Sequence, residues 1–338
     1  MNPTSLKRVL RKTIQEKKPV LIYGPPGVGK TDVITQIVEE LQQKLIIFLP
    51  SISEPIDYKG LPVFNQETEI ASFVPFDVLN ELVTADEPTI VFVDDFGQAN
   101  QSVQAALMNL FRARRVGDRQ ISEHITFVLA TNDKNHHAGV GGILEPIKSR
   151  MISLIELTVS LEDWIQWALQ KQLDPSLIGF MRLRGNELLS KFEPTTSLSN
   201  SPSPRAQEAV STIIKMGFPR DIEFELIEGA AGTGYATEIR GFLSLFRNLV
   251  SPEEILHDPA NVEIPADNPM VTYAYCGSLA SVASPDNMDK IIVFAKRLPI
   301  EFQVKLIQYD CLSTNRANHE TAAYTDWSIE NQGILSAA

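Results

Sequence analysis

The sequence has few of the residues that mark disulfide-rich, metal-binding or membrane proteins. Only Cys276 and Cys311 are cysteines among 338 residues, too few for a disulfide framework, and no Cys/His pair has the spacing of a metal site. No apolar run approaches the ~18 residues that a membrane-spanning helix needs. We therefore expect no membrane span and a reducing, cytoplasmic location.

Positive charge is also in deficit. The chain has 30 Lys and Arg against 42 Asp and Glu, for a net charge of -12. Binding to nucleic-acid phosphates depends on clustered Lys and Arg. The balance argues against general nucleic-acid binding, although a local basic patch remains compatible with it.

The pattern of apolar residues predicts two kinds of structure. The chain exceeds the ~250 residues at which single cores usually stop growing, so we expect more than one domain. Short apolar runs separated by polar or helical stretches occur at 20–23, 45–49, 89–93, 125–130 and 151–157. Such runs alternating with helices predict a parallel sheet covered on both faces.

Beyond residue 160 the pattern becomes helical. Helices are predicted at 161–172, 175–189, 204–216, 238–250 and 288–294, with loops or linkers at 195–203 and 257–269. The basic segment 1–18 has apolar residues at helical spacing. We interpret it as a surface helix leading into the first strand rather than as a transit peptide.

A phosphate-binding loop follows the first predicted strand. The motif G-x-x-x-x-G-K-[ST] is matched in full by Gly24, Pro25, Pro26, Gly27, Val28, Gly29, Lys30 and Thr31. Its glycines allow backbone N–H groups to close around phosphates, Lys30 reaches the β- and γ-phosphates, and Thr31 can bind Mg²⁺. An ordinary Gly-rich turn is the alternative, and the flanking strand and amphipathic helix argue against it.

Polar residues follow two further predicted strands. Asp94 and Asp95 come directly after 89–93, where Asp94 is placed to bind Mg²⁺ and Asp95 to orient or deprotonate the attacking water. Asp95 could alternatively cap the next helix. Asn132 follows 125–130 and could hydrogen-bond the γ-phosphate or the water, or be a turn residue. His136 and His137 are interpreted as loop residues rather than metal ligands.

Together these motifs resemble the AAA+ ATPases, and within them the MoxR-like family of the dynein-related AAA subgroup. Residues 24–31 are similar to Walker A, 90–95 to Walker B, and Asn132 to sensor 1. Arg150 resembles the arginine finger and Arg205 the sensor 2 arginine. Residues 57–62 and 162–164 also fit MoxR-like proteins.

The resemblance implies an α/β fold: a P-loop AAA+ αβα sandwich with a five-stranded parallel sheet, followed by an all-helical lid domain. The expected boundaries are 1–158 for the nucleotide-binding core, 159–250 for the helical lid, and 251–338 for its helical C-terminal extension. Arg150 would enter a neighbouring subunit's site, which requires a homo-oligomer, expected to be a hexamer. Arg205 would contact the γ-phosphate from the lid. Both arginines could instead be ordinary surface residues.

The implied activity is Mg²⁺-dependent ATP hydrolysis that remodels a client or adaptor protein, with a von Willebrand factor A domain protein as the partner that the resemblance suggests. The family usually has Glu where Asp95 stands. Because Asp is one methylene shorter, hydrolysis is expected to be slow if the carboxylate is misplaced. A slow-turnover, ATP-gated binding module is therefore the alternative, and a nucleic-acid motor is disfavoured by the acidic balance.

Other segments admit two interpretations each. Tyr58, Lys59 and Gly60 could grip a polypeptide, but a turn fixed by Asp57 and Gly60 is favoured. A helix end carries Arg112, Arg114 and Arg115, which could reach a neighbour's nucleotide or simply be solvated. Packing of the lid core is expected for Trp164 and Trp167, a loop for residues 229–234, and a packed terminal helix around Trp327.

Overall fold

The structure, a computed structural model, describes residues 1–67, 69–133, 141–191, 200–264 and 269–335. The chain divides into two compact units, the first being Met1–Thr158 and the second beginning at Val159. Among the described residues, no helix is both long and apolar enough to cross a membrane. His136 and His137 lie outside the described residues, as do parts of both predicted linkers.

The first unit is built on a five-stranded parallel sheet in the order β2-β5-β8-β1-β9. Its strands are β1 (Val20–Gly24), β2 (Lys44–Phe48), β5 (Thr89–Val93), β8 (Ile125–Asn132) and β9 (Ser153–Glu156). All five strands that the apolar runs predict are confirmed. Every residue of the two central strands β5 and β8 is buried, as expected for a sheet covered on both faces.

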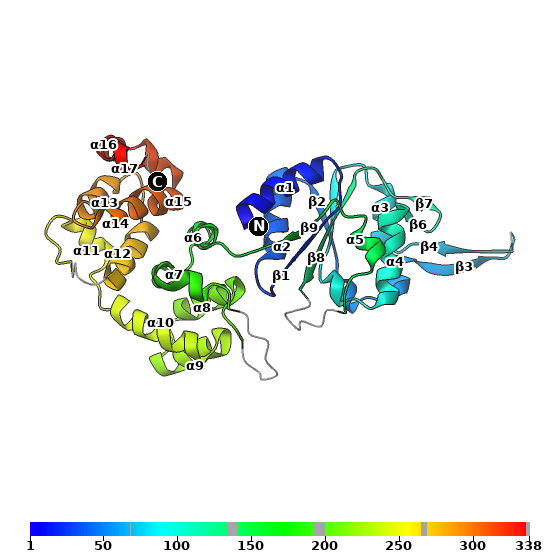
Figure 1. The fold of residues 1–338 in the computed structure, drawn as a ribbon, viewed down its shortest axis with the longest axis horizontal. Coiled ribbons are helices and arrows are strands. Elements are labelled where there is room, and N and C mark those ends of the chain that lie inside the picture. The colour runs from blue at the N-terminus through cyan, green and yellow to red at the C-terminus, as the bar shows by residue number, and fades with distance from the viewer. Residues whose placement is uncertain (68, 134–140, 192–199, 265–268, 336–338) are drawn as a thin grey trace. The chain divides into compact units, whose positions relative to one another are not determined.

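Helices cover both faces of this sheet (Figure 1). Side chains alternate along β5, so that Val91 and Val93 join the core formed with α3 (Asp77–Thr84) and α4 (Gln101–Arg112). Ile90 and Phe92 point to the opposite face and are equally buried. That face carries α1 (Pro3–Gln15) and α2 (Lys30–Leu41). The predicted αβα sandwich is confirmed.

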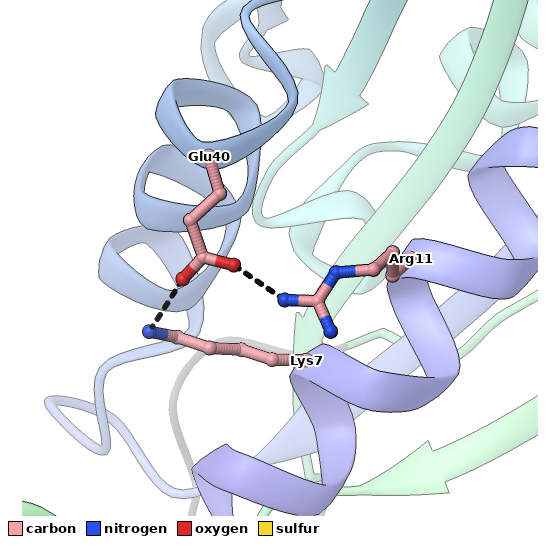
Figure 2. A network of polar contacts seen from close by, with 3 residues as sticks. All are labelled: Lys7, Arg11 and Glu40. Atoms are coloured by element: carbon pink, nitrogen blue, oxygen red, sulfur yellow. Dashed lines mark hydrogen bonds and ion pairs between the residues drawn. The ribbon is translucent and has the colours of Figure 1, made fainter.

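Helix α1 is the surface helix expected at the start of the chain. Leu6, Leu10 and Ile14 form its buried stripe. Glu40 of α2 lies between two cations of α1, with Oε1 3.3 Å from Lys7 Nζ and Oε2 2.7 Å from Arg11 Nη2 (Figure 2). Because these charges are partly exposed to solvent, the apolar stripe contributes most of the stability of this contact.

Two β-hairpins were not predicted from the sequence. Strands β3 (Leu61–Asn65) and β4 (Ile70–Val74) form an antiparallel pair, as do β6 (Arg115–Val116) and β7 (Arg119–Gln120). The turn between β3 and β4 has neither the Gly nor the Asn-Gly pair that signals a hairpin. Short helical segments connect the rest of the unit: η1 (Pro50–Ile52), η2 (Pro55–Tyr58), η3 (Phe96–Gln98) and α5 (Glu145–Lys148).

The second unit is helical, as predicted. Its first part contains α6 (Leu161–Gln170), α7 (Pro175–Leu188), α8 (Pro204–Met216), α9 (Arg220–Ala231) and α10 (Thr233–Phe246). Its remainder contains α11 (Pro252–His257), α12 (Pro269–Ser281), α13 (Met288–Ala295), α14 (Ile300–Val304), the π-helical η5 (Lys305–Cys311), α15 (Leu312–Thr314), η6 (Arg316–Glu320), α16 (Ala322–Glu330) and α17 (Gln332–Leu335). One hydrophobic core contains residues from both sides of position 250.

The predictions for this unit had mixed outcomes. Trp164 is buried and Trp167 packs against the core, as expected, and Trp327 of α16 is fully buried. The loop predicted at 229–234 was wrong. Helix α9 continues to Ala231 and α10 begins two residues later, because only Gly232, with φ 89°, breaks the helical path.

A buried ion pair joins α7 to the π-helical segment. Arg182 Nη2 contacts Asp310 Oδ1, and their side chains are 0% and 2% exposed. Burial raises the pKa of Asp310 from its ordinary 3.8 to about 6, although Arg182 and Lys305 act in the opposite direction. The desolvation of the carboxylate therefore outweighs its attraction to the guanidinium.

This raised pKa makes stability depend on pH. Between pH ~4 and ~6 the folded Asp310 binds more protons than the unfolded one, so its contribution to the free energy of unfolding falls as pH rises, by up to about 3 kcal/mol. Urea unfolding of the second unit, followed by the fluorescence of its three tryptophans, should show this slope in the parent and not in Asp310→Asn. If the free energy of unfolding depended on pH in the same way in both proteins, this prediction would be contradicted.

Candidate functional site

The strand order brings three polar strand ends to one edge of the sheet. Gly24, the last residue of β1, is paired with Asn132, the last residue of β8. On the other side of β8, β5 ends at Val93, and Asp94 and Asp95 follow directly. The phosphate loop, the aspartate pair and Asn132 thus lie at the carboxyl edge, where open α/β sheets bind ligands.

The phosphate loop has the backbone that its glycines predict. Gly27 and Gly29 have φ of 73° and 97°, in the left-handed region that side chains disfavour. A Cβ at Gly24 would lie 2.7 Å from the carbonyl oxygen of Leu157, so a larger residue would displace the loop. Val28 is buried and anchors the loop. Gly29 then begins α2, whose positive end faces the loop.

Lys30 holds its ammonium group inside this loop. Nζ donates to Gly24 O at 3.1 Å, to Pro25 O at 3.0 Å and to Asn132 Oδ1 at 2.7 Å. The residue is only 7% exposed. A buried cation so close to the helix start gives the loop the charge that a phosphate chain requires.

The side chain of Asn132 connects Lys30 to Asp95. Since an ammonium group only donates, the Asn132 oxygen must face Lys30, and its amide nitrogen donates to Asp95 Oδ1 at 3.3 Å. The amide therefore fixes the carboxylate of Asp95 relative to the loop lysine. The two hydrogen bonds join Asn132 to Lys30, which is 102 positions away in the sequence, and to Asp95, which is 37 positions away.

Thr31 and Asp94 form a second contact at the same edge. Thr31 Oγ1 donates to Asp94 Oδ2 at 2.7 Å, and Asp94 Oδ1 accepts the backbone N–H of Asp95 at 2.9 Å. A hydroxyl and a carboxylate are the oxygen ligands that Mg²⁺ prefers, so the donor set fits this ion. Within the described ranges no group of three His, Cys, Asp or Glu side chains could hold a metal. Phosphate and water oxygens would have to supply the other ligands.

Asp95 has an unusual backbone conformation. Its φ of 52° and ψ of 31° lie in the left-handed region, which Asp tolerates better than most residues. It begins η3, but its side chain makes no capping hydrogen bond. The capping interpretation of Asp95 is therefore wrong, and its carboxylate faces Asn132 instead.

The structure places the two candidate arginines on other elements. Arg150 follows α5, is half-buried, and donates from Nη1 to the carbonyl of Pro146 in that helix. Arg205 is exposed in the first turn of α8, in the second unit. The hydrogen bonds described above unite Lys30, Thr31, Asp94, Asp95 and Asn132, all of them residues of the first unit.

The segment that could have gripped a polypeptide is a structural turn. Tyr58 is buried, its ring packs edge-on against Phe48 at 5.5 Å, and its hydroxyl donates to Ser53 Oγ at 3.0 Å. Asp57 Oδ2 accepts the N–H of Glu54 at 2.8 Å. Gly60 has φ 86°. The turn prediction is confirmed, and Tyr58 is unavailable for gripping.

Arg114 also has a structural role. Its Nη2 donates to the carbonyls of Ser122 and Ile125 at 2.7 and 3.0 Å, and burial lowers the pKa of its guanidinium. It therefore does not reach a neighbour's nucleotide. Arg112 and Arg115 remain exposed.

Sequence reasoning missed Gln104, which supports the segment leading to Arg150. Its Nε2 donates to Ala99 O at 3.1 Å and to Gly142 O at 2.8 Å, and its Oε1 accepts the N–H of Leu144 at 3.1 Å. Gln104 is 1% exposed. A glutamine in the apolar stripe of α4 was the available signal, because a buried amide must find partners.

Comparisons with known proteins agree with this site. Residues 19–151 match the family described as AAA domain (dynein-related subfamily). The Holliday junction branch migration complex subunit RuvB of Prochlorococcus marinus is 31% identical over 123 residues, 34% of each chain. An AAA ATPase forming ring-shaped complexes, from Corynebacterium diphtheriae, is 35% identical over 85 residues, 24% of this chain and 16% of that protein. The chain thus spans about a third of the length of the RuvB relative and less of the other.

Among solved structures, RuvB of Thermotoga maritima resembles the chain with a TM-score of 0.41 and 15% identity, over 77% of this chain and 74% of that one. This likeness is too weak to assign a role. The family match, in contrast, covers every residue of the site described above.

Proposed function

We propose that this chain, whose residues 19–151 match an AAA domain, binds ATP with Mg²⁺ at the carboxyl edge of its sheet and hydrolyses it. The observation that carries the proposal is the contact chain from Lys30 through Asn132 to Asp95, beside the Thr31–Asp94 pair. It places a cation, an amide and a carboxylate around the loop that holds phosphates.

Each residue then has a distinct task. Backbone N–H groups of residues 24–31 and Lys30 bind the phosphates, while Thr31 and Asp94 would hold Mg²⁺. When bound, that ion neutralises phosphate charge. Asp95 would accept a proton from the attacking water, and Asn132 keeps its carboxylate in place through the hydrogen bond between the two side chains.

The proposed site is completed by arginines from elsewhere. Arg150 would act on the nucleotide of a neighbouring subunit, which gives the protein a reason to assemble into a ring, proposed to be a hexamer. Arg205 would sense the γ-phosphate from the helical lid, proposed as residues 159–250, with 251–338 as its extension. A ring-forming relative and the family match support this assembly.

Hydrolysis in such an assembly would drive the remodelling of a partner protein. The resemblance to MoxR-like proteins suggests a von Willebrand factor A domain protein as that partner. The net charge of -12 favours a protein over a nucleic acid. Both cysteines are free and buried, as suits a protein of the reducing cytoplasm.

Two alternatives rest on specific observations. A slow ATP-gated switch is favoured by Asp at position 95, where the family usually has Glu. A DNA motor is favoured by the name of the RuvB relatives, although they match over only about a third of their length. Strong stimulation of turnover by nucleic acid would support the motor and count against protein remodelling.

Replacement of Asp95 tests hydrolysis. Asp95→Asn should lower steady-state turnover at least ~100-fold and leave ATP affinity nearly unchanged, because only the proton acceptor is lost. The exposed control Asp86→Asn should behave like the parent.

Asp95→Glu should give no large gain in steady-state turnover, since the left-handed backbone at this position suits Asp. A gain of about tenfold or more would instead identify the parent as a slow switch.

Mixing inactive variants tests the shared site. Arg150→Ala and Lys30→Ala should each be nearly inactive, and mixed subunits should recover turnover, because an intact Arg150 can then serve an intact phosphate loop. An Arg112→Ala variant provides an exposed-arginine control. Failure of recovery at every mixing ratio, with mixed assembly verified, would contradict an arginine supplied between subunits.

A further inference from the structure

The β3–β4 hairpin projects from the body of the first unit (Figure 1). Its base is fixed by close packing, because a Cβ at Gly60 would lie 2.3 Å from Val74 O and 3.0 Å from Pro75 Cα. Gly117, in the turn between β6 and β7, lies beside Phe73 at the same base. The hairpin therefore leaves the domain in a defined direction.

Both faces of this hairpin are apolar, and their large side chains are exposed. The register pairs Pro62 with Phe73 and Phe64 with Ala71 on one face, and Leu61 with Val74 and Val63 with Ser72 on the other. Its exposed large apolar side chains are Leu61 (48%), Val63 (48%), Phe64 (60%), Ile70 (63%), Phe73 (52%) and Val74 (49%). Since two strands alone are marginally stable in water, this surface is suited to a partner that covers it.

The charges of the hairpin restrict the kind of partner. Residues 61–74 contain no Lys, Arg or His, and Glu67 and Glu69 lie at the turn. Nucleic-acid phosphates would find no cation within residues 61–74. A second copy of this chain would bring the same acidic hairpin and a net charge of -12, so its charge is not complementary.

We infer that the β3–β4 hairpin docks an extended, apolar segment of a partner protein that carries basic residues. An extended segment can pair with a free hairpin edge and add a third strand, which a helix cannot do. Strand β4 is the better edge, because Pro62 removes one backbone donor from β3. The inference deepens the proposed function by assigning the partner's contact, but docking itself requires no ATP hydrolysis.

Peptide binding tests this surface. The probe is a short dye-labelled peptide in which valine and lysine alternate, titrated with the full chain and followed by fluorescence anisotropy. Phe64→Ser/Phe73→Ser should weaken its affinity at least about tenfold, since two exposed aromatic contacts are lost without any change of charge. The conservative Phe64→Leu/Phe73→Leu pair should retain most of the affinity.

Ile52→Ser is the matched control, because Ile52 is 82% exposed in the same unit but outside the hairpin. It should bind the peptide like the parent. Circular dichroism verifies that each variant remains folded, and ATP uptake is measured separately. Intact ATP uptake with failed docking refutes only the hairpin inference, whereas loss of ATP uptake by the parent refutes only the proposed function.

Three results would overturn the inference. The first is equal peptide affinity for the parent and the Ser pair. The second is equal binding of a peptide with glutamate in place of lysine. The third is a smaller oligomer for the Ser pair in size-exclusion chromatography, which would show that a second copy covers the hairpin.

Discussion

The amide of Asn132 connects two groups of opposite charge that chemistry at this site requires. It accepts from Lys30 and donates to Asp95, so the loop cation and the proposed proton acceptor keep a fixed relation. This contact exists only because β8 lies between β1 and β5 in the sheet. The strand order, in turn, depends on buried apolar strands that need helices on both faces. Packing of the sheet thus determines the geometry of the site.

Local patterns were sufficient to predict much of the fold and the components of the site. The phosphate loop and the five strands are continuous in sequence, so motif and apolar run identify them directly. Neighbouring strands could not be identified in this way, because pairing such as Gly24 with Asn132 is a long-range property. The β3–β4 hairpin was missed for lack of a turn signal, and residues 229–234 appeared loop-like because glycines are also tolerated at a junction of two helices.

Local sequence patterns also cannot identify contacts between subunits or units, so the roles of Arg150 and Arg205 remain proposals. The proposed partner of Arg150 belongs to another subunit, and Arg205 belongs to the second unit, so no pattern within the first unit can test either role. Within the first unit, Gln104 fixes the backbone that leads to the helix before Arg150, through hydrogen bonds to Gly142 and Leu144. This support would hold Arg150 in a defined position for its proposed role. The exposed β3–β4 hairpin is a second surface whose proposed role requires a partner protein. Much of the proposed function would therefore reside between chains, with the proposed nucleotide site as the chemical centre within each chain.

Calorimetric titration of ATP with Mg²⁺ tests the central claim most directly, namely that Lys30 holds a triphosphate at the edge defined by Thr31 and Asp94. The parent should bind, and Lys30→Ala should bind at least about tenfold more weakly, because charge-assisted hydrogen bonds to phosphate are lost. Lys44→Ala, which removes an exposed lysine paired with Glu81, should leave binding unchanged. Unaltered binding by Lys30→Ala, or none by the parent, would contradict the account.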